Sequence, residues 1–215
     1  MSVVYVVTVL VVIFVSMTLH ELAHGLVANR LGDRTARDSG RLTLNPLRHV
    51  DPFMTVILPI MIMFINIATG ASMPVFGGAK PVPFNSKNIK YDEMGVALVA
   101  LSGPLVNLVL AFITYMILVL SGSGTGTILT TILTAATMVN LGFFAFNIIP
   151  IPPLDGSRVL YAIAPDFVRN LFDAIEQYGV VLIFLVVMAG GQFITTYMNF
   201  IITNTLRVFS VVFGG

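Results

Sequence analysis

The 215-residue sequence contains no cysteine and few charged residues. Without cysteine there is no disulfide and no thiolate metal ligand, so any metal must be bound by His, Asp or Glu. Charged residues make up only 10% of the chain, whereas an ordinary soluble domain has about a quarter. Hydrophobic residues make up 57%. This composition predicts an integral membrane protein in contact with the lipid bilayer, and nothing in it indicates nucleic-acid binding.

The N-terminus also lacks a basic region and an A-x-A-like cleavage site, so a cleaved signal peptide is not expected. Four segments meet or approach the length of about 20 mostly apolar residues that a membrane-spanning helix needs. They are Val3 to about Arg30, Met94–Leu120, Ile128–Ile149 and the uncharged run Gln177–Leu206. The last run forms either one span or, if the amphipathic stretch Pro165–Glu176 begins the first of them, two.

No stretch remains for a separate globular domain. We therefore predict one domain, residues 1–215, with an all-α polytopic membrane fold of about 5–6 membrane helices. Its expected core elements are residues 3–30, 94–120 and 128–158, followed by C-terminal helices within about 165–213.

A shorter apolar segment, Pro52–Ala68, has only 17 residues, a length often found in re-entrant segments. If it spanned the membrane, the basic residues around it would be divided evenly between the two sides. If it dips in and returns, they share one side, and the loops around 121–126 and 190–191 carry no positive charge. The residues concerned are Arg30, Arg34, Arg37, Arg41, Arg48, Lys80, Lys87, Lys90, Arg158 and Arg169. The positive-inside rule favours the second arrangement, which predicts a re-entrant region at about 52–86 and an N-terminus outside the cell.

The stretch ASMPVFGGAKPVPFN, residues 71–85, follows this segment. Apolar residues flank Gly77-Gly78, which is typical of two short extended pieces around a tight turn, and Pro81 and Pro83 remove backbone donors. Local sequence leaves two interpretations open: a surface loop, or a β-hairpin-like loop associated with the membrane. We carry the second forward as the prediction.

The motif LHELAH, residues 19–24, ends an uncharged run that begins at Met1. His20 and His24 are four residues apart, so on a helix their imidazoles stack on one face and can converge on one metal ion, with Glu21 beside them. Each ionisable residue inside a membrane segment costs roughly a few kcal/mol, so three within five positions need a partner such as a cation. The alternative is a helix that has reached the interface, with both histidines solvated.

A catalytic zinc keeps three protein ligands, and the third must come from elsewhere. The remaining histidine is His49, and the downstream glutamates Glu93 and Glu176 have no metal-binding context. Asp155 follows an uncharged segment in FNIIPIPPLDGSR, residues 146–158, whose prolines break the helix. It is either a ligand or an ordinary loop aspartate after a helix end. The re-entrant topology favours the first, because it places Asp155 on the same side as His20 and His24.

HELAH, SGPLVN (residues 102–107) and NIIPIPPLDG (residues 147–156) resemble the three signature elements of the site-2 protease family of intramembrane zinc metalloproteases. The stretches at 40–52 and 77–85 are also similar to those of its compact bacterial and archaeal members, although the chain has no room for the PDZ domain of some members. The resemblance implies one Zn²⁺ held by His20, His24 and Asp155, with Glu21 as general base. It implies an endopeptidase that cuts within or near the transmembrane segments of single-pass membrane proteins in regulated intramembrane proteolysis. A bacterial or archaeal cell membrane is the expected location, and the positive-inside arrangement places the active site toward the cytosol.

Three asparagines are further candidates for the site. In the family, residues that match Asn107 and Asn147 are thought to contact substrate or the oxyanion, and Asn140 shares a helix face with Asn147. Hydrogen bonding between helices is the alternative role for all three. Intramembrane polar residues also suit a transporter or channel, or a protein that binds membrane helices without cutting them. The HExxH spacing with a matching aspartate favours catalysis.

Overall fold

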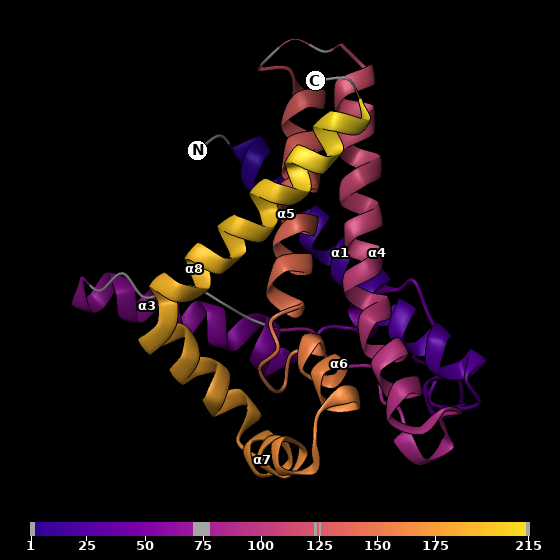
Figure 1. The fold of residues 1–215 in the computed structure, drawn as a ribbon. Coiled ribbons are helices and arrows are strands. Elements are labelled where there is room, and N and C mark those ends of the chain that lie inside the picture. The colour runs from indigo at the N-terminus through magenta and orange to yellow at the C-terminus, as the bar shows by residue number, and fades with distance from the viewer. Residues whose placement is uncertain (1–2, 71–77, 123, 125, 214–215) are drawn as a thin grey trace.

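The computed structural model describes residues 3–70, 78–122, 124 and 126–213. Its α-helices are α1 (Val3–Arg30), α2 (Thr35–Asp38), α3 (Leu58–Thr69), α4 (Asp92–Leu120), α5 (Ile128–Asn147), α6 (Asp155–Ile163), α7 (Asp166–Glu176) and α8 (Gly179–Val212). Three shorter elements complete the order: the 3-10 turns Pro46–Arg48 and Ser86–Asn88, and a π-helical turn Pro52–Ile57 that leads into α3. The predicted all-α class is confirmed for these residues (Figure 1).

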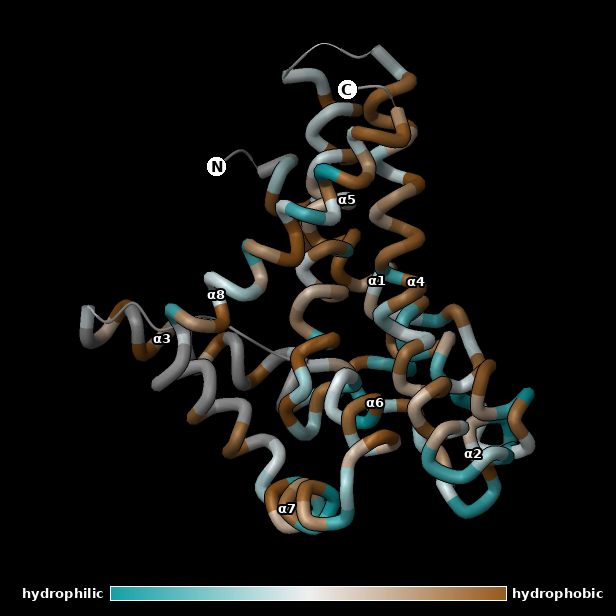
Figure 2. The backbone as a smooth tube through the Cα atoms, in the orientation of Figure 1, coloured by the Kyte–Doolittle hydropathy of each residue, from teal (hydrophilic) through white to brown (hydrophobic). Residues whose placement is uncertain are grey.

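Three helices in the described ranges are long and apolar enough to cross a membrane: Tyr5–Arg30 of α1, α4 and α5. They confirm three of the four predicted long spans, and hydrophobic residues dominate α4 and α5 in Figure 2. The total of 5–6 membrane helices is not confirmed. The single-domain organisation stays a prediction.

Helix α4 packs against α1, α5 and α6. Small residues, including Gly95, Ala100 and Gly103, are buried along it. In lipid the helices gain little from the hydrophobic effect, so close backbone approach between small residues supplies much of the packing energy. The arrangement brings the second half of α1 against the first half of α4, where the polar residues of both helices lie.

The proline-rich turn after α5 returns the chain to α4. Gly156 is needed there, because a Cβ at this position would lie 2.2 Å from the carbonyl oxygen of Ile148. Ile149 and Leu154 of the turn are buried in a cluster with Ile194 of α8. The turn thereby fixes the start of α6, whose first residue is Asp155.

The segment that contains α3 begins and ends at neighbouring positions beside the helix bundle. α3 lies across the direction of α4 and α5 (Figure 1). The Thr55 hydroxyl donates to Gly78 O at 2.6 Å, and Val50 forms an isolated antiparallel bridge with Ala79. Both ends of the segment therefore lie at the same end of the bundle, as a re-entrant path requires, although entry into the membrane stays a prediction.

The predicted β-hairpin is not confirmed. Its residues 71–77 lie outside the described residues, and residues 78–85 form only the bridge at Ala79 and no strand. Pro81 and Pro83 explain this locally, because neither can donate to a ladder.

The C-terminal region consists of two helices. α7 is strongly amphipathic in sequence, with Phe167 and Leu171 exposed. α8 is one continuous helix that passes through Gly190-Gly191 and runs from α7 to the other end of the molecule (Figure 1). Its Phe209 packs against Ala111 and Leu141. From Gly179 onward, the run Gln177–Leu206 therefore forms one helix and not two.

Candidate metal centre

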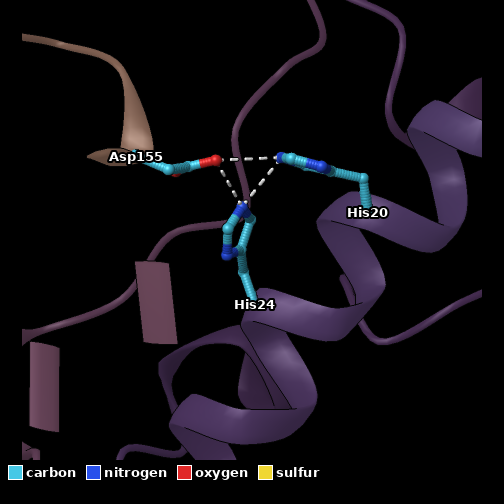
Figure 3. Close-up of side chains that lie close together, drawn as sticks. All are labelled: His20, His24 and Asp155. Carbon is cyan, nitrogen blue, oxygen red and sulfur yellow. Dashed lines mark hydrogen bonds and ion pairs between the residues drawn. The ribbon is translucent and has the colours of Figure 1, made fainter. Parts of the chain in front are cut away.

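Three ionisable side chains from α1 and α6 converge on one point (Figure 3). Nε2 of His20 lies 3.0 Å from Nε2 of His24. Oδ2 of Asp155 lies 3.2 Å from His20 Nε2 and 3.5 Å from His24 Nε2. The structure thus brings together the three residues that the sequence predicts as metal ligands.

A backbone carbonyl fixes the protonation of His24. Its Nδ1 lies 2.8 Å from Val99 O on α4. Because a carbonyl can only accept, Nδ1 carries the proton and donates it, and in the neutral ring Nε2 is left with a free lone pair. Ser102 also donates to Val99 O, at 2.6 Å.

A chain of amides fixes His20 in the same way. Asn140 Nδ2 donates to the Ala136 carbonyl at 2.8 Å, so its Oδ1 faces Asn107 and accepts from Asn107 Nδ2 at 3.0 Å. Oδ1 of Asn107 must then face Nδ1 of His20, 2.6 Å away, and accept its proton. In the neutral ring, Nε2 of His20 is therefore also left with a free lone pair.

Two nitrogen lone pairs and a carboxylate oxygen consequently face one another. Asp155 Oδ2 is buried and has no hydrogen-bond partner among the described residues. A single proton could bridge only one pair of these atoms, whereas a divalent cation compensates all three. Ligands at about 2.0–2.1 Å in a tetrahedral zinc site lie about 3.3–3.4 Å apart, and the observed separations of 3.0, 3.2 and 3.5 Å bracket that value. The residues present fit zinc.

Gly103 keeps the centre open on the side of α4. A Cβ at this position would lie 2.5 Å from Nε2 of His24 and 2.6 Å from Nε2 of His20. The glycine of SGPLVN is thus required by the volume of the metal centre and not by helix packing alone.

Glu21, the predicted general base, is 9% exposed and lies at the inner face of the bundle. Its Oε2 accepts a hydrogen bond from the backbone N–H of Val82 at 2.8 Å. Its position on α1 between the two histidine ligands is the one that the HExxH pattern predicts. Its role as a base stays a prediction.

The other candidates lie elsewhere. His49 is fully buried, and its Nε2 contacts Thr43 O at 3.0 Å. Glu176 pairs with Arg158. Asn147 donates to Phe143 O within its own helix. Direct contact of Asn107, Asn140 or Asn147 with substrate stays a prediction, but the first two plainly form the support of His20. The sequence reasoning missed Val99 and Val82, which act through backbone groups that no residue pattern displays.

Comparison with known proteins agrees with this geometry. The sequence model of "Peptidase family M50" matches residues 8–127 and 124–190. The chain is 36% identical over 212 residues to "Putative zinc metalloprotease YwhC" of Bacillus subtilis, with 94% of this chain and 91% of that protein covered. It is 30% identical over 176 residues to "Putative zinc metalloprotease Rip2" of Mycobacterium tuberculosis (strain H37Rv), with 81% and 64% covered, and 28% identical over 169 residues to the Mycolicibacterium smegmatis protein of the same name, with 78% and 61% covered.

No solved structure matches the chain. The family match covers most of the sequence, and the three apolar helices agree with an integral membrane location. His20, His24 and Asp155 form a group that could hold a metal ion, in agreement with the zinc metalloprotease relatives. The chain therefore belongs to peptidase family M50, the site-2 protease family, and is an integral membrane zinc metalloprotease.

Proposed function

We propose that this protein is an intramembrane endopeptidase that hydrolyses peptide bonds within or near the transmembrane segments of membrane proteins. The observation that carries the proposal is the convergence of His20, His24 and Asp155, because both histidines lie on α1, a helix that is apolar and long enough to cross a membrane. A soluble metalloprotease would have no reason to build its centre there, since ionisable groups in such a helix are costly. Single-pass membrane proteins are the expected substrates, and regulated intramembrane proteolysis is the expected process.

The residues divide the chemistry among them. His20, His24 and Asp155 would hold zinc, which when bound supplies a Lewis acid and lowers the pKa of bound water to about 7. Glu21 takes the proton of the attacking water and returns it to the leaving amine. Asn147 is the proposed donor to the oxyanion.

The substrate must be extended before it is cut, because a helix hides its carbonyl groups in backbone hydrogen bonds. The segment at residues 78–85 offers a place for it, since its Ala79 is already paired as an isolated bridge and its Val82 N–H contacts Glu21. An unwound substrate adding to this extended backbone would be positioned by main-chain hydrogen bonds. The prolines on either side of Val82 limit pairing with unrelated chains.

We propose that the active site faces the cytosol of a bacterial or archaeal cell and that the N-terminus lies outside. Hydrophilic residues gather around α2 and α7, at the end of the molecule where α6 lies (Figure 2). The absence of cysteine permits a direct test. In intact cells, a membrane-impermeant maleimide should label Thr127→Cys and not Ser39→Cys, and the reverse labelling would overturn the orientation.

The activity is tested with purified protein, a transmembrane test substrate, and the variants Glu21→Gln and Asp155→Ala. We expect about one zinc per chain in wild type and in Glu21→Gln, less zinc in Asp155→Ala, and cleavage by wild type only. Cleavage by Glu21→Gln at the wild-type rate would contradict the assigned base. A wild-type protein that binds no zinc and cuts nothing would favour transport or simple helix binding.

A further inference from the structure

The sequence Pro81-Val82-Pro83 presents one backbone donor to the centre. Proline has no N–H, so Val82 N–H is isolated between two residues that cannot donate. It donates to Oε2 of Glu21 at 2.8 Å, across 61 positions of the chain. A carboxylate has about four lone-pair sites, so this bond fixes the side chain and still leaves Glu21 able to accept a proton.

Arg41 holds this segment from the outside. Its Nη2 donates to Lys80 O at 2.9 Å and to Pro81 O at 3.3 Å. Arg41 as a whole residue is 9% exposed, and within the described residues its guanidinium forms no ion pair with a carboxylate. A buried charge without an ionic partner is costly. The placement of Arg41 beside these two carbonyls therefore indicates that it serves to hold this segment.

Two further bonds tie the segment at either side of Val82. Lys80 N donates to His49 O at 2.8 Å, and His49 is completely buried. Asn85 N donates to Oδ2 of Asp33 at 2.7 Å. Residues 80–85 are therefore fixed to the loops after α1, and the N–H of Val82 is presented in one position.

We infer that Arg41 is a positioning residue for Glu21, acting through the backbone of Pro81 and Val82. It holds the two carbonyls just before Val82, so that the Val82 N–H orients the carboxylate of Glu21. This inference rests on the proposed function, because it assigns a role in the same reaction. It predicts that the segment determines the rate of the chemical step and not substrate affinity alone.

The first experiment removes the donor itself. Val82→Pro deletes the N–H, whereas Val82→Ala keeps the N–H and loses only side-chain packing. We expect kcat to fall by about tenfold or more in Val82→Pro, as for a lost hydrogen bond to a charged group, with KM and zinc content close to wild type. Val82→Ala should stay within about threefold of wild type, since it keeps that bond. Equal losses of kcat in the two variants, or a loss expressed in KM with kcat unchanged, would overturn the inference.

The second experiment tests the positioning role of Arg41 even if Val82→Pro does not fold. Arg41→Gln should lower kcat about tenfold, and Arg41→Lys should recover part of that loss because lysine can still donate to a carbonyl. The exposed Arg37 provides the control, and Arg37→Gln should leave kcat unchanged.

A double-mutant cycle identifies the route of the effect. Glu21→Asp keeps a carboxylate but is too short to reach Val82 N–H in the same way. If Arg41 acts through Glu21, Arg41→Gln should cost less than about twofold in the Glu21→Asp background, because coupled residues are not additive. If the wild-type protein cuts its substrate and the effects of the two substitutions are fully additive, the positioning role of Arg41 is rejected and the proposed function stands. A wild-type protein without activity would instead reject the proposed function.

Discussion

Oδ1 of Asn107 lies 2.6 Å from Nδ1 of His20, and this contact decides which nitrogen of the imidazole faces the metal centre. Asn107 is fully buried and is itself oriented by Asn140. Residues that hold the second nitrogen of a ligand histidine typically contribute 10–100-fold to metal affinity. The α4–α5 contact is therefore part of the zinc site, although neither asparagine binds zinc.

Replacing Asn107 by alanine should weaken zinc binding by about 10–100-fold, because His20 loses the acceptor that fixes its tautomer. Competition with a fluorescent chelator measures the affinity. Thr114→Val is the matched control: it lies on the same two-helix interface, where its hydroxyl contacts that of Thr137 at 3.0 Å, away from the histidines. An equal loss of zinc affinity in the control would show that helix packing, and not His20, is responsible.

The close approach of Gly103 to both ligand histidines leads to a second prediction. Gly103→Ala would place a methyl group 2.5–2.6 Å from both Nε2 atoms, so we expect loss of zinc and of cleavage while the helices still form. Gly142→Ala is the control, because a Cβ there meets nothing within 4 Å. It should be neutral or stabilising by up to about 1 kcal/mol through helix propensity. Zinc content and circular dichroism of both variants test the claim, and normal zinc content in Gly103→Ala would contradict it.

Sequence reasoning predicted the parts of this centre that depend on side chains in a regular pattern. His20 and His24 follow from helical spacing, and Asp155 follows from the topology, which places it on the same side of the membrane. The sequence could not show that Val99 presents a carbonyl to His24, since backbone groups leave no residue signature. The same limit applies to Val82.

The same contrast between features that the sequence predicts and features that it does not is seen in the fold. Long uncharged runs predicted α1, α4 and α5, because the length of an apolar helix is set by the thickness of the bilayer. The hairpin at 71–85 was inferred from a short alternating pattern, and its described part forms only one bridge. Pairing of such short pieces depends on tertiary contacts like those of Arg41 and His49, which local sequence does not encode.

Asp33 predicts a pH dependence of stability. It is fully buried just after α1, and burial opposes its ionisation. Hydrogen bonds from Thr35, Asn85 and Asn88 outweigh that effect and hold the pKa of the Asp33 carboxyl below its usual value. Its contribution to stability is therefore complete above the unfolded pKa of about 4 and is lost as the pH falls through the lower folded pKa.

Asp33→Asn should consequently destabilise the protein by about 1–3 kcal/mol at neutral pH. The difference in thermal stability from wild type should shrink below about pH 4. Thermal unfolding in detergent across that range measures it, and the exposed Asp38→Asn should differ little from wild type at any pH. A wild-type advantage that grows on acidification would have the wrong sign for a carboxylate stabilised in its charged form.

Zinc should stabilise the folded protein, because the three ligand atoms converge only when α1 and α6 are in place. Binding to the native state alone adds about 2.7 kcal/mol when free zinc is 100 times its dissociation constant. Asp155→Asn removes the anionic ligand at nearly constant shape, so the rise in melting temperature on adding zinc should largely disappear. Asp166→Asn, an exposed acidic residue at the start of α7, should keep the wild-type response. A wild-type melting temperature that neither chelator nor zinc changes would contradict zinc binding to the native state. If wild type responds and Asp155→Asn responds equally, Asp155 is not the third ligand and its buried Oδ2 needs another partner.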